Sequence, residues 1–448
     1  MIRYLFILFQ FIVLLIIASW SIQNSKPISF LFNDITITTS TSFVIIGLII
    51  IIVVVLLIQR FVFFVKQSSQ KYKFYRERSI YQKGYNAFLE GMVAIANKDF
   101  KKAILESKNI NKYLKDRSLS LLLKSESLKI EKKYNELNNV YEEMLNNPQT
   151  NLLGLRGLME QNIRAQDYHH AFVYGEKLFY LNPKIDKLYE TLVNIIAKTN
   201  NWHKFLQIND QSLQYKVIDK KIYAENKSIA YYEIAKIKQH SSAKESINLM
   251  EKALKLRENF SPYVSFYIQI LINENQLEKA KKILKKTWTA LPHPSLKNVI
   301  KILAKKMKVS YYEISKFITS NLLANPETRM LLTEALIEEN NWTDARNQIK
   351  SLLEHKPLKQ VCLLMAKIEE GDSGDPQKID AWIARSNTGK LSKIWICQVS
   401  GLTQVNWTSI SQSGYFNSLV WQNQNNIPQF TESLGSGVEA SSINYINN

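Results

Sequence analysis

The residues closest to a chemical motif lie near the C-terminus, in two segments that resemble the knuckles of a zinc ribbon. Cys397-Gln398-Val399-Ser400-Gly401 takes the place of a C-x-x-C-G knuckle, and Ile410-Ser411-Gln412-Ser413-Gly414 would be the second. A closed zinc site of this type needs four thiolates, but three of the four positions hold Ser400, Ile410 and Ser413. Hydroxyls and an isoleucine cannot replace thiolates, so we expect no metal here. The aromatic residues nearby could still maintain a metal-free fold.

The other candidate ligands are isolated from one another. His169 and His170 are adjacent, so on a helix they point about 100° apart and cannot grip one metal from one face. His203 follows Trp202, and His293 lies in a loop between two prolines. Neither G-x-G-x-x-G nor G-x-x-x-x-G-K-S/T occurs, so dinucleotide and phosphate-loop sites lack their basic requirement. We expect no catalytic residue, no metal and no cofactor, with haem or porphyrin binding as the alternative.

A repeat organises most of the chain. Aromatic residues that follow a short polar break are each 34 residues apart: Phe100, Tyr134, Tyr168 and Trp202. A small or apolar residue stands three positions after each of them: Ala103, Leu137, Ala171 and Phe205. After one longer unit the pattern returns at Ala243 and Leu277 (with Ser246 and Ala280) and at Trp342 (with Ala345).

A 34-residue helix–turn–helix period is typical of tetratricopeptide repeats. The polar residues end the first helix, the aromatic packs between helices, and the small residue lets the second helix approach its neighbour. We therefore predict an all-α fold, with eight to nine helix pairs between Tyr81 and about Glu370 in a right-handed solenoid, least regular at 290–325. The solenoid domain is assigned to 84–370. Its first helices form a concave surface that is expected to bind segments of other proteins.

Composition changes after the repeats. Residues 371–376 (Gly-Asp-Ser-Gly-Asp-Pro) predict the end of the helical region. A short helix at 379–384 then opens a small Trp-rich module, assigned to 379–421, which resembles a degenerate zinc ribbon. The Asn-, Ser- and Gln-rich tail from 422 to 448 predicts disorder.

Two apolar stretches open the chain. Residues 43–65 contain only Gln59 and Arg60 as polar interruptions, which is about the 20 residues needed to cross a bilayer. The first stretch, 4–20, is near the short end for a span; a cleaved signal peptide is the alternative, although its cleavage site would be poor. We expect a two-span helical hairpin over 1–65, whose external loop, 21–42, forms a small β-hairpin about Asn33-Asp34.

Positive charge follows the second span directly. The formal net charge is +19, and the juxtamembrane segment 66–83 carries most of a cluster opposed by one acid, Glu77. The basic residues expected at the membrane surface are Arg60, Lys66, Lys71, Lys73, Arg76, Arg78 and Lys83. The positive-inside rule then places both ends of the hairpin, and the repeat domain, in the cytoplasm. The remaining charges are interspersed and favour solvated helix faces over a nucleic-acid partner.

With these elements in place, the chain resembles the HemY family of bacterial inner-membrane proteins linked to haem biosynthesis, in its α-proteobacterial form. The resemblance covers most of the chain. It rests on the two-span start, the basic stretch, and the segments 83–99, 395–401 and 414–421. It implies a non-catalytic, multi-pass inner-membrane protein that organises enzymes of late porphyrin metabolism. An unrelated flavin-dependent oxidase has carried the same name, but no dinucleotide fingerprint occurs here.

Three functions therefore stand as hypotheses. The first is a membrane-anchored scaffold for haem-biosynthesis enzymes. The second is a scaffold for envelope or lipopolysaccharide assembly, against which the incomplete C-x-x-C positions and the second span both count. The third is direct haem or porphyrin binding, for which aromatic residues are plentiful but fall mostly at repeat core positions.

Overall fold

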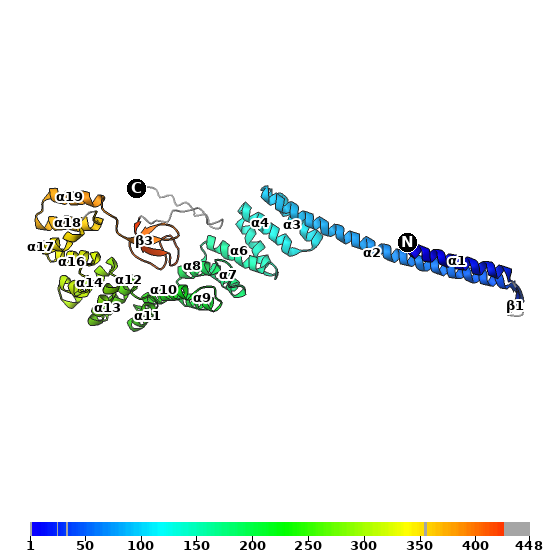
Figure 1. Cartoon of the computed structure of the whole chain (residues 1–448), viewed down its shortest axis with the longest axis horizontal. Coiled ribbons are helices and arrows are strands. Elements are labelled where there is room, and N and C mark those ends of the chain that lie inside the picture. Colours follow the sequence, from blue (N-terminus) through cyan, green and yellow to red (C-terminus); the bar gives the residue numbers. More distant parts are fainter. Residues whose placement is uncertain (1, 25, 33–34, 354–355, 425–448) are drawn as a thin grey trace. The chain divides into compact units, whose positions relative to one another are not determined.

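The computed structural model describes residues 2–24, 26–32, 35–353 and 356–424. The chain divides into two compact units, Met1–Val140 and Tyr141–Asn448, and each is described by itself. The expected disordered tail lies outside the described residues from 425 onward. Figure 1 shows the order of the elements, which are helical except for two small sheets.

The first unit opens with a helical hairpin. Helix α1 (Ile2–Gln23) leads into strands β1 (Pro27–Phe32) and β2 (Ile35–Ser40), and α2 (Thr41–Ala96) follows. The strands pair antiparallel from Pro27↔Ser40 to Phe32↔Ile35, so the expected β-hairpin is confirmed. At its base, the hydroxyl of Ser42 donates a hydrogen bond to the carbonyl oxygen of Ser21 at 2.7 Å.

One segment of the described residues, Thr41–Val65 in α2, is long and apolar enough to cross a membrane. It corresponds to the second expected span. Its apolar side chains are largely exposed, Phe43 by 73% and Phe63 by 76%, as a lipid-facing helix requires. The first expected span forms α1, several of whose side chains lie outside the described part. The two-span prediction is therefore only partly supported.

Helix α2 continues through the basic segment without interruption. The last turns of α2 are themselves the first helix of the first pair, so the basic segment 66–83 and the start of the expected repeat domain at 84 lie on one helix. Ala87, Ala94 and Ile95 are buried there with Ala103 of the next helix. A Cβ at Gly91 would lie 2.3 Å from Cδ2 of Leu123, so a larger residue there would require the Leu123 side chain to shift.

Helix pairs fill the rest of the first unit and most of the second. The end of α2 pairs with α3 (Phe100–Leu114), and α4 (Arg117–Glu131) precedes α5 (Tyr134–Leu145). The later pairs are α6 (Asn151–Arg164) with α7 (Tyr168–Leu181), α8 (Leu188–Lys198) with α9 (Trp202–Gln214), α10 (Lys220–Lys238) with α11 (Ala243–Leu256), α12 (Ser261–Asn273) with α13 (Leu277–Ala290), α14 (Lys297–Met307) with α15 (Tyr311–Thr319), and α16 (Pro326–Glu338) with α17 (Trp342–Ile349). Short 3-10 turns precede α14 (η1, Pro294–Leu296) and follow α17 (η2, Lys350–Leu352). The predicted tetratricopeptide fold is confirmed.

A common turn joins the helices within a pair. Gln166 adopts a left-handed conformation with φ 59°, and the next residue, Asp167, caps α7 by accepting a hydrogen bond from the amide of His170 at 3.1 Å. Asn340 (φ 56°) and Asn341 repeat this arrangement before α17. The polar residues of the sequence pattern therefore first reverse the chain and then satisfy the amides of the following helix.

The segment expected to end the helical region is instead the turn of one further pair. Helix α18 runs over Lys359–Asp372 and α19 over Pro376–Asn387, so α19 includes the expected short helix. Gly374 takes the left-handed position (φ 62°), and Asp375 caps α19 by accepting from the amide of Gln377. A Gly-Asp-Pro sequence supplies the same turn chemistry as the other pairs, so it continues the array rather than ending it.

A small sheet follows the last pair. Its strands β3 (Ile394–Cys397), β4 (Thr403–Gln404) and β5 (Leu419–Gln422) are antiparallel in the order β4-β3-β5. We call residues 394–422 the C-terminal module. Its buried residues Trp395, Cys397, Trp407 and Leu419 belong to the same hydrophobic cluster as the helices of the second unit, so the module is packed onto the repeats.

Candidate functional site

The repeat-defining residues occupy equivalent places. Each aromatic is the first residue of a second helix, as in α3, α5, α7, α9 and α17. The residue three positions later is fully buried, with an exposed fraction of 0%, at Ala103, Leu137, Ala171, Phe205, Ser246, Ala280 and Ala345. These residues form the framework of the array. They build its core, and two of them, Trp202 and Phe205, also contact the C-terminal module.

The irregular stretch contains a repeat start that the sequence pattern did not reveal. Tyr311 begins α15 and lies 34 residues after Leu277, which begins α13. Ser310 caps α15 by accepting from the amide of Glu313. Ile314, three residues after Tyr311, is 2% exposed but is not small. The equal spacing could have identified this unit, whereas the search for a small residue missed it.

The basic residues expected at the membrane surface all lie on α2. The side chains of Arg60, Lys73, Arg76, Arg78 and Lys83 are exposed. Lys66 and Lys71 lie on the same helix, but their side chains fall outside the described part. Tyr72 and Tyr75, 72% and 66% exposed, accompany them. Aromatic and basic side chains of this kind are typical of a membrane interface.

The two knuckle segments do come together in the C-terminal module. The backbone amide of Ser400 donates to the sulfur of Cys397 at 3.4 Å, and the Ser413 hydroxyl donates to it at 3.3 Å. The hydroxyls of Ser400 and Ser413 are 2.6 Å apart. Hydrogen bonds thus connect residues that would be metal ligands in a zinc ribbon. Among the described residues, no group of three or more His, Cys, Asp or Glu side chains is placed to hold a metal.

The thiol of Cys397 is chemically unusual but inaccessible. Burial raises its pKa, while hydrogen bonds with Ser400, Ser413 and Ser418 lower it more strongly, to about 6. Cys397 is 1% exposed, so this pKa supports no reaction with solutes. Cys362, in α18, is fully buried, and burial raises its pKa.

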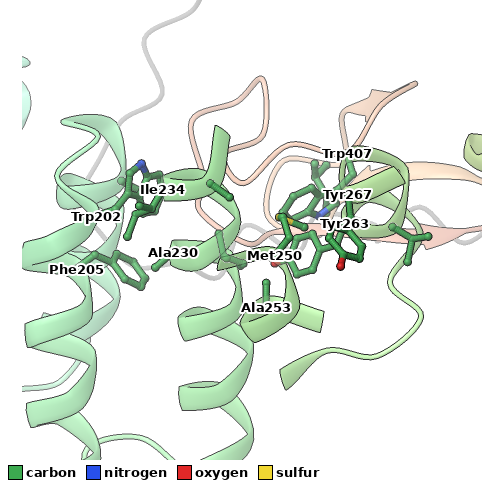
Figure 2. Packing of buried hydrophobic residues seen from close by; sticks show 14 of the residues in the cluster. Trp202, Phe205, Ala230, Ile234, Met250, Ala253, Tyr263, Tyr267 and Trp407 are labelled. Atoms are coloured by element: carbon green, nitrogen blue, oxygen red, sulfur yellow. The ribbon is translucent and has the colours of Figure 1, made fainter. Parts of the chain in front are cut away.

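The C-terminal module contacts the first helices of two successive pairs, α10 and α12. The indole of Trp407, 7% exposed, enters a cage formed by Tyr232 of α10, Tyr263 of α12 and Phe260 at the start of α12. The ring centroids lie 5.6, 5.6 and 5.1 Å from that of Trp407, all edge-to-face, the arrangement that aromatic pairs prefer. Figure 2 shows Trp407 approaching Tyr263 from the module. Burial raises the pKa of Tyr232 and of Tyr263, so both rings stay neutral.

A second contact lies on α8 and α9. The ring of Phe416 packs against Trp202 and Phe205, with centroids 6.4 and 5.0 Å away. The amide of Phe416 donates to Oδ1 of Asn194 at 2.8 Å. The side-chain amide of Asn417 donates to Oδ1 of Asn226 on α10 at 3.4 Å.

A third contact involves His293, which is 4% exposed rather than a free loop residue. Its ring lies 4.4 Å from Trp421 and 6.0 Å from Trp395, between centroids. Burial, with a smaller contribution from Lys393, lowers the pKa of His293 to about 4. The imidazole is therefore neutral at physiological pH. His169, His170 and His203, by contrast, are exposed.

The eight residues that the module covers are here called the seat: Asn194, Trp202, Phe205, Asn226, Tyr232, Phe260, Tyr263 and His293. The seat spans α8 to α12 and continues to His293. The chain's own C-terminal module thus covers residues of α8, α10 and α12, which are first helices of their pairs, and of α9, which is a second helix. Sequence reasoning did not find this contact.

Comparison with known proteins adds a family match. Residues 28–131 match the family described as HemY protein N-terminus. The probable magnetosome protein Mms48 of Magnetospirillum gryphiswaldense is 23% identical over 172 residues, which cover 37% of this chain and 38% of that protein. The match thus spans well under half the length of this curated relative.

Several solved structures are also similar. The structure of Naa15/Naa10 bound to HypK-THB is 11% identical, with 67% of this chain and 49% of that chain covered and a TM-score of 0.42. The complex of the TPR2AB domain of yeast Sti1 with pHSP90 is 10% identical, with coverages of 68% and 99% and a TM-score of 0.30. Residues 28–131, about a quarter of the chain, are thus similar to the N-terminal part of HemY proteins.

Proposed function

We propose that this protein is a non-catalytic, membrane-anchored scaffold whose tetratricopeptide pairs bind other proteins, and that these are enzymes of late haem biosynthesis. The observation that carries the proposal is the joining, in one helix, of an apolar segment of membrane-spanning length to the first repeat pair. Stacked pairs of this kind offer extended surfaces for protein segments. The similarity of residues 28–131 to the N-terminus of HemY proteins supports the haem assignment.

We also propose that both apolar helices cross the inner membrane and that the repeat domain lies in the cytoplasm. The exposed basic residues of α2 support this orientation through the positive-inside rule. A topology reporter fused after Lys83 is expected to be active in the cytoplasm. Activity only in the periplasm would contradict the proposed orientation.

The partner assignment is tested by crosslinking the full chain in native membranes and identifying the proteins that co-purify. A chain lacking residues 84–448 keeps the hairpin and serves as the control. We expect enrichment of porphyrin-pathway enzymes such as ferrochelatase with the full chain alone. Enrichment of lipopolysaccharide-assembly components instead would indicate that the protein is a scaffold for envelope assembly.

A further inference from the structure

The contact between the C-terminal module and the seat leaves buried polar atoms unpaired. Nε1 of Trp202, Nε1 of Trp407 and Nε2 of His293 are all buried without a hydrogen-bond partner. Nδ1 of His293 accepts from the amide of Ser295 at 3.2 Å, so in the neutral ring Nε2 carries the proton. Three N–H donors at one contact therefore lack acceptors, which costs stability that a better-matched occupant would recover.

Two buried groups of the repeat core are paired. The indole of Trp288, fully buried between repeats, donates to the Thr328 hydroxyl at 2.8 Å. Beneath the seat, the hydroxyl of Tyr189 donates to Asn209 at 2.6 Å and accepts from Asn226 at 2.8 Å. Buried polar atoms without partners also occur elsewhere in the described repeats, such as the hydroxyls of Ser127 and Ser315. The unpaired ring N–H groups of the described residues, however, all belong to the module contact, where aromatic rings match in shape but their polar groups do not.

The module is tethered independently of the seat. Just before it, the amide of Lys359 donates to the Lys390 carbonyl at 2.8 Å, and the Lys390 amide donates to the Pro357 carbonyl at 2.9 Å. These bonds hold the connecting segment to the start of α18. The module can therefore leave the seat without unfolding a helix pair, and it remains nearby as a competitor at high effective concentration.

We propose that the C-terminal module is a displaceable occupant of the seat, and that the seat binds a partner-protein segment which presents a tryptophan side chain to the cage of Tyr232, Phe260 and Tyr263. Trp407 shows what the cage accepts. The backbone carbonyls of an extended segment supply the acceptors that Trp202 and His293 lack. The inference rests on the proposed scaffold function and names the binding site and the chemistry of its partner.

The first test measures release of the module. Full chains in lipid nanodiscs carry Trp407→Ala or, as the matched control, Val405→Ala, since Val405 lies on the module and is 78% exposed. Amide hydrogen exchange in residues 394–422 is expected to rise at least tenfold in the first variant and to stay unchanged in the control. Unchanged exchange in Trp407→Ala would overturn the idea of a displaceable module.

The second test measures occupation of the seat. The probe is a fluorescent peptide with the sequence of residues 402–417 of this chain, compared with the same peptide carrying Trp407→Ala. We expect the tryptophan peptide to bind the Trp407→Ala chain at least tenfold more tightly than the unaltered chain, and the alanine peptide to bind neither. Equal binding to both chains, or binding to neither, would overturn the assignment of the seat.

A double variant localises the binding. Adding Phe260→Ala to the Trp407→Ala chain removes one of the three aromatic rings that surround the tryptophan. We expect this change to weaken binding of the peptide at least tenfold. Circular dichroism checks that both variants keep their helices; Phe416→Ala replaces Trp407→Ala if the latter loses them. If the peptide does not bind but porphyrin-pathway enzymes still crosslink to the full chain, the seat is not a binding site and the proposed scaffold function remains. If the peptide binds but no porphyrin-pathway enzyme crosslinks, the seat is a binding site and only the haem assignment is wrong.

Discussion

The repeat pairs and the C-terminal module are stabilised in contrasting ways. Each pair closes through residues adjacent in sequence, a left-handed polar residue followed by a capping side chain, as at Gln166 and Asp167. The module contacts residues far along the chain, and Phe416 is 222 positions from Asn194. The buried indole of Trp288 between pairs donates to Thr328, whereas the module contact leaves three ring N–H donors unpaired. The difference separates a permanent framework from a conditional contact.

The largest effect is expected where the framework itself is damaged. Trp288→Ala removes a fully buried indole and leaves the Thr328 hydroxyl without its donor. We expect a loss of about 3–5 kcal/mol in unfolding free energy, measured by denaturant unfolding followed by circular dichroism. Trp382→Ala, at a half-buried residue of α19, is the matched control with a smaller expected loss. Equal losses of unfolding free energy in the two variants would contradict the prediction that Trp288 contributes more to stability than Trp382.

The module contact is expected to respond to acid. The pKa of His293 is lowered from 6.5 to about 4, so stability from the neutral ring is complete above pH 6.5 and is lost as pH falls from 6.5 towards 4. Between pH 7.5 and 5, opening of residues 394–422 should rise roughly 30-fold, measured by hydrogen exchange corrected for intrinsic rates. His293→Gln should abolish this dependence, and His203→Gln should preserve it. A pH response that survives His293→Gln would assign it to another group.

The smallest effect is expected at a single cap. Asp167→Ala removes the acceptor for the amide of His170 at the start of α7, and we expect a loss of about 1 kcal/mol. Asp380→Ala, inside α19, is the control for loss of charge alone. If Asp167→Ala lowers the unfolding free energy no more than Asp380→Ala does, the hydrogen bond at the cap contributes little to the stability of the turn.

Sequence reasoning succeeded where local chemistry decides the structure. The starts at Phe100 and Trp202 are visible because cap, aromatic and buried residue lie within a few positions. The same chemistry was misread at Gly374-Asp375-Pro376, because a turn between paired helices and the end of an array use the same residues. The seat could not be predicted, since Trp407 and Tyr263 are joined by packing between distant segments, which no spacing records.

The continuity of α2 sets a distance. Under the proposed topology, in which Thr41–Val65 crosses the bilayer, α2 runs on unbroken from Val65 to Gly84, where packing against the second helix of the first pair begins. At 1.5 Å per residue this interval is about 30 Å long. The start of the array is thus carried on a stiff stalk rather than a flexible tether. Partners of the first pair must accordingly extend a comparable height from the membrane, which favours those with raised domains over those lying flat on the lipid.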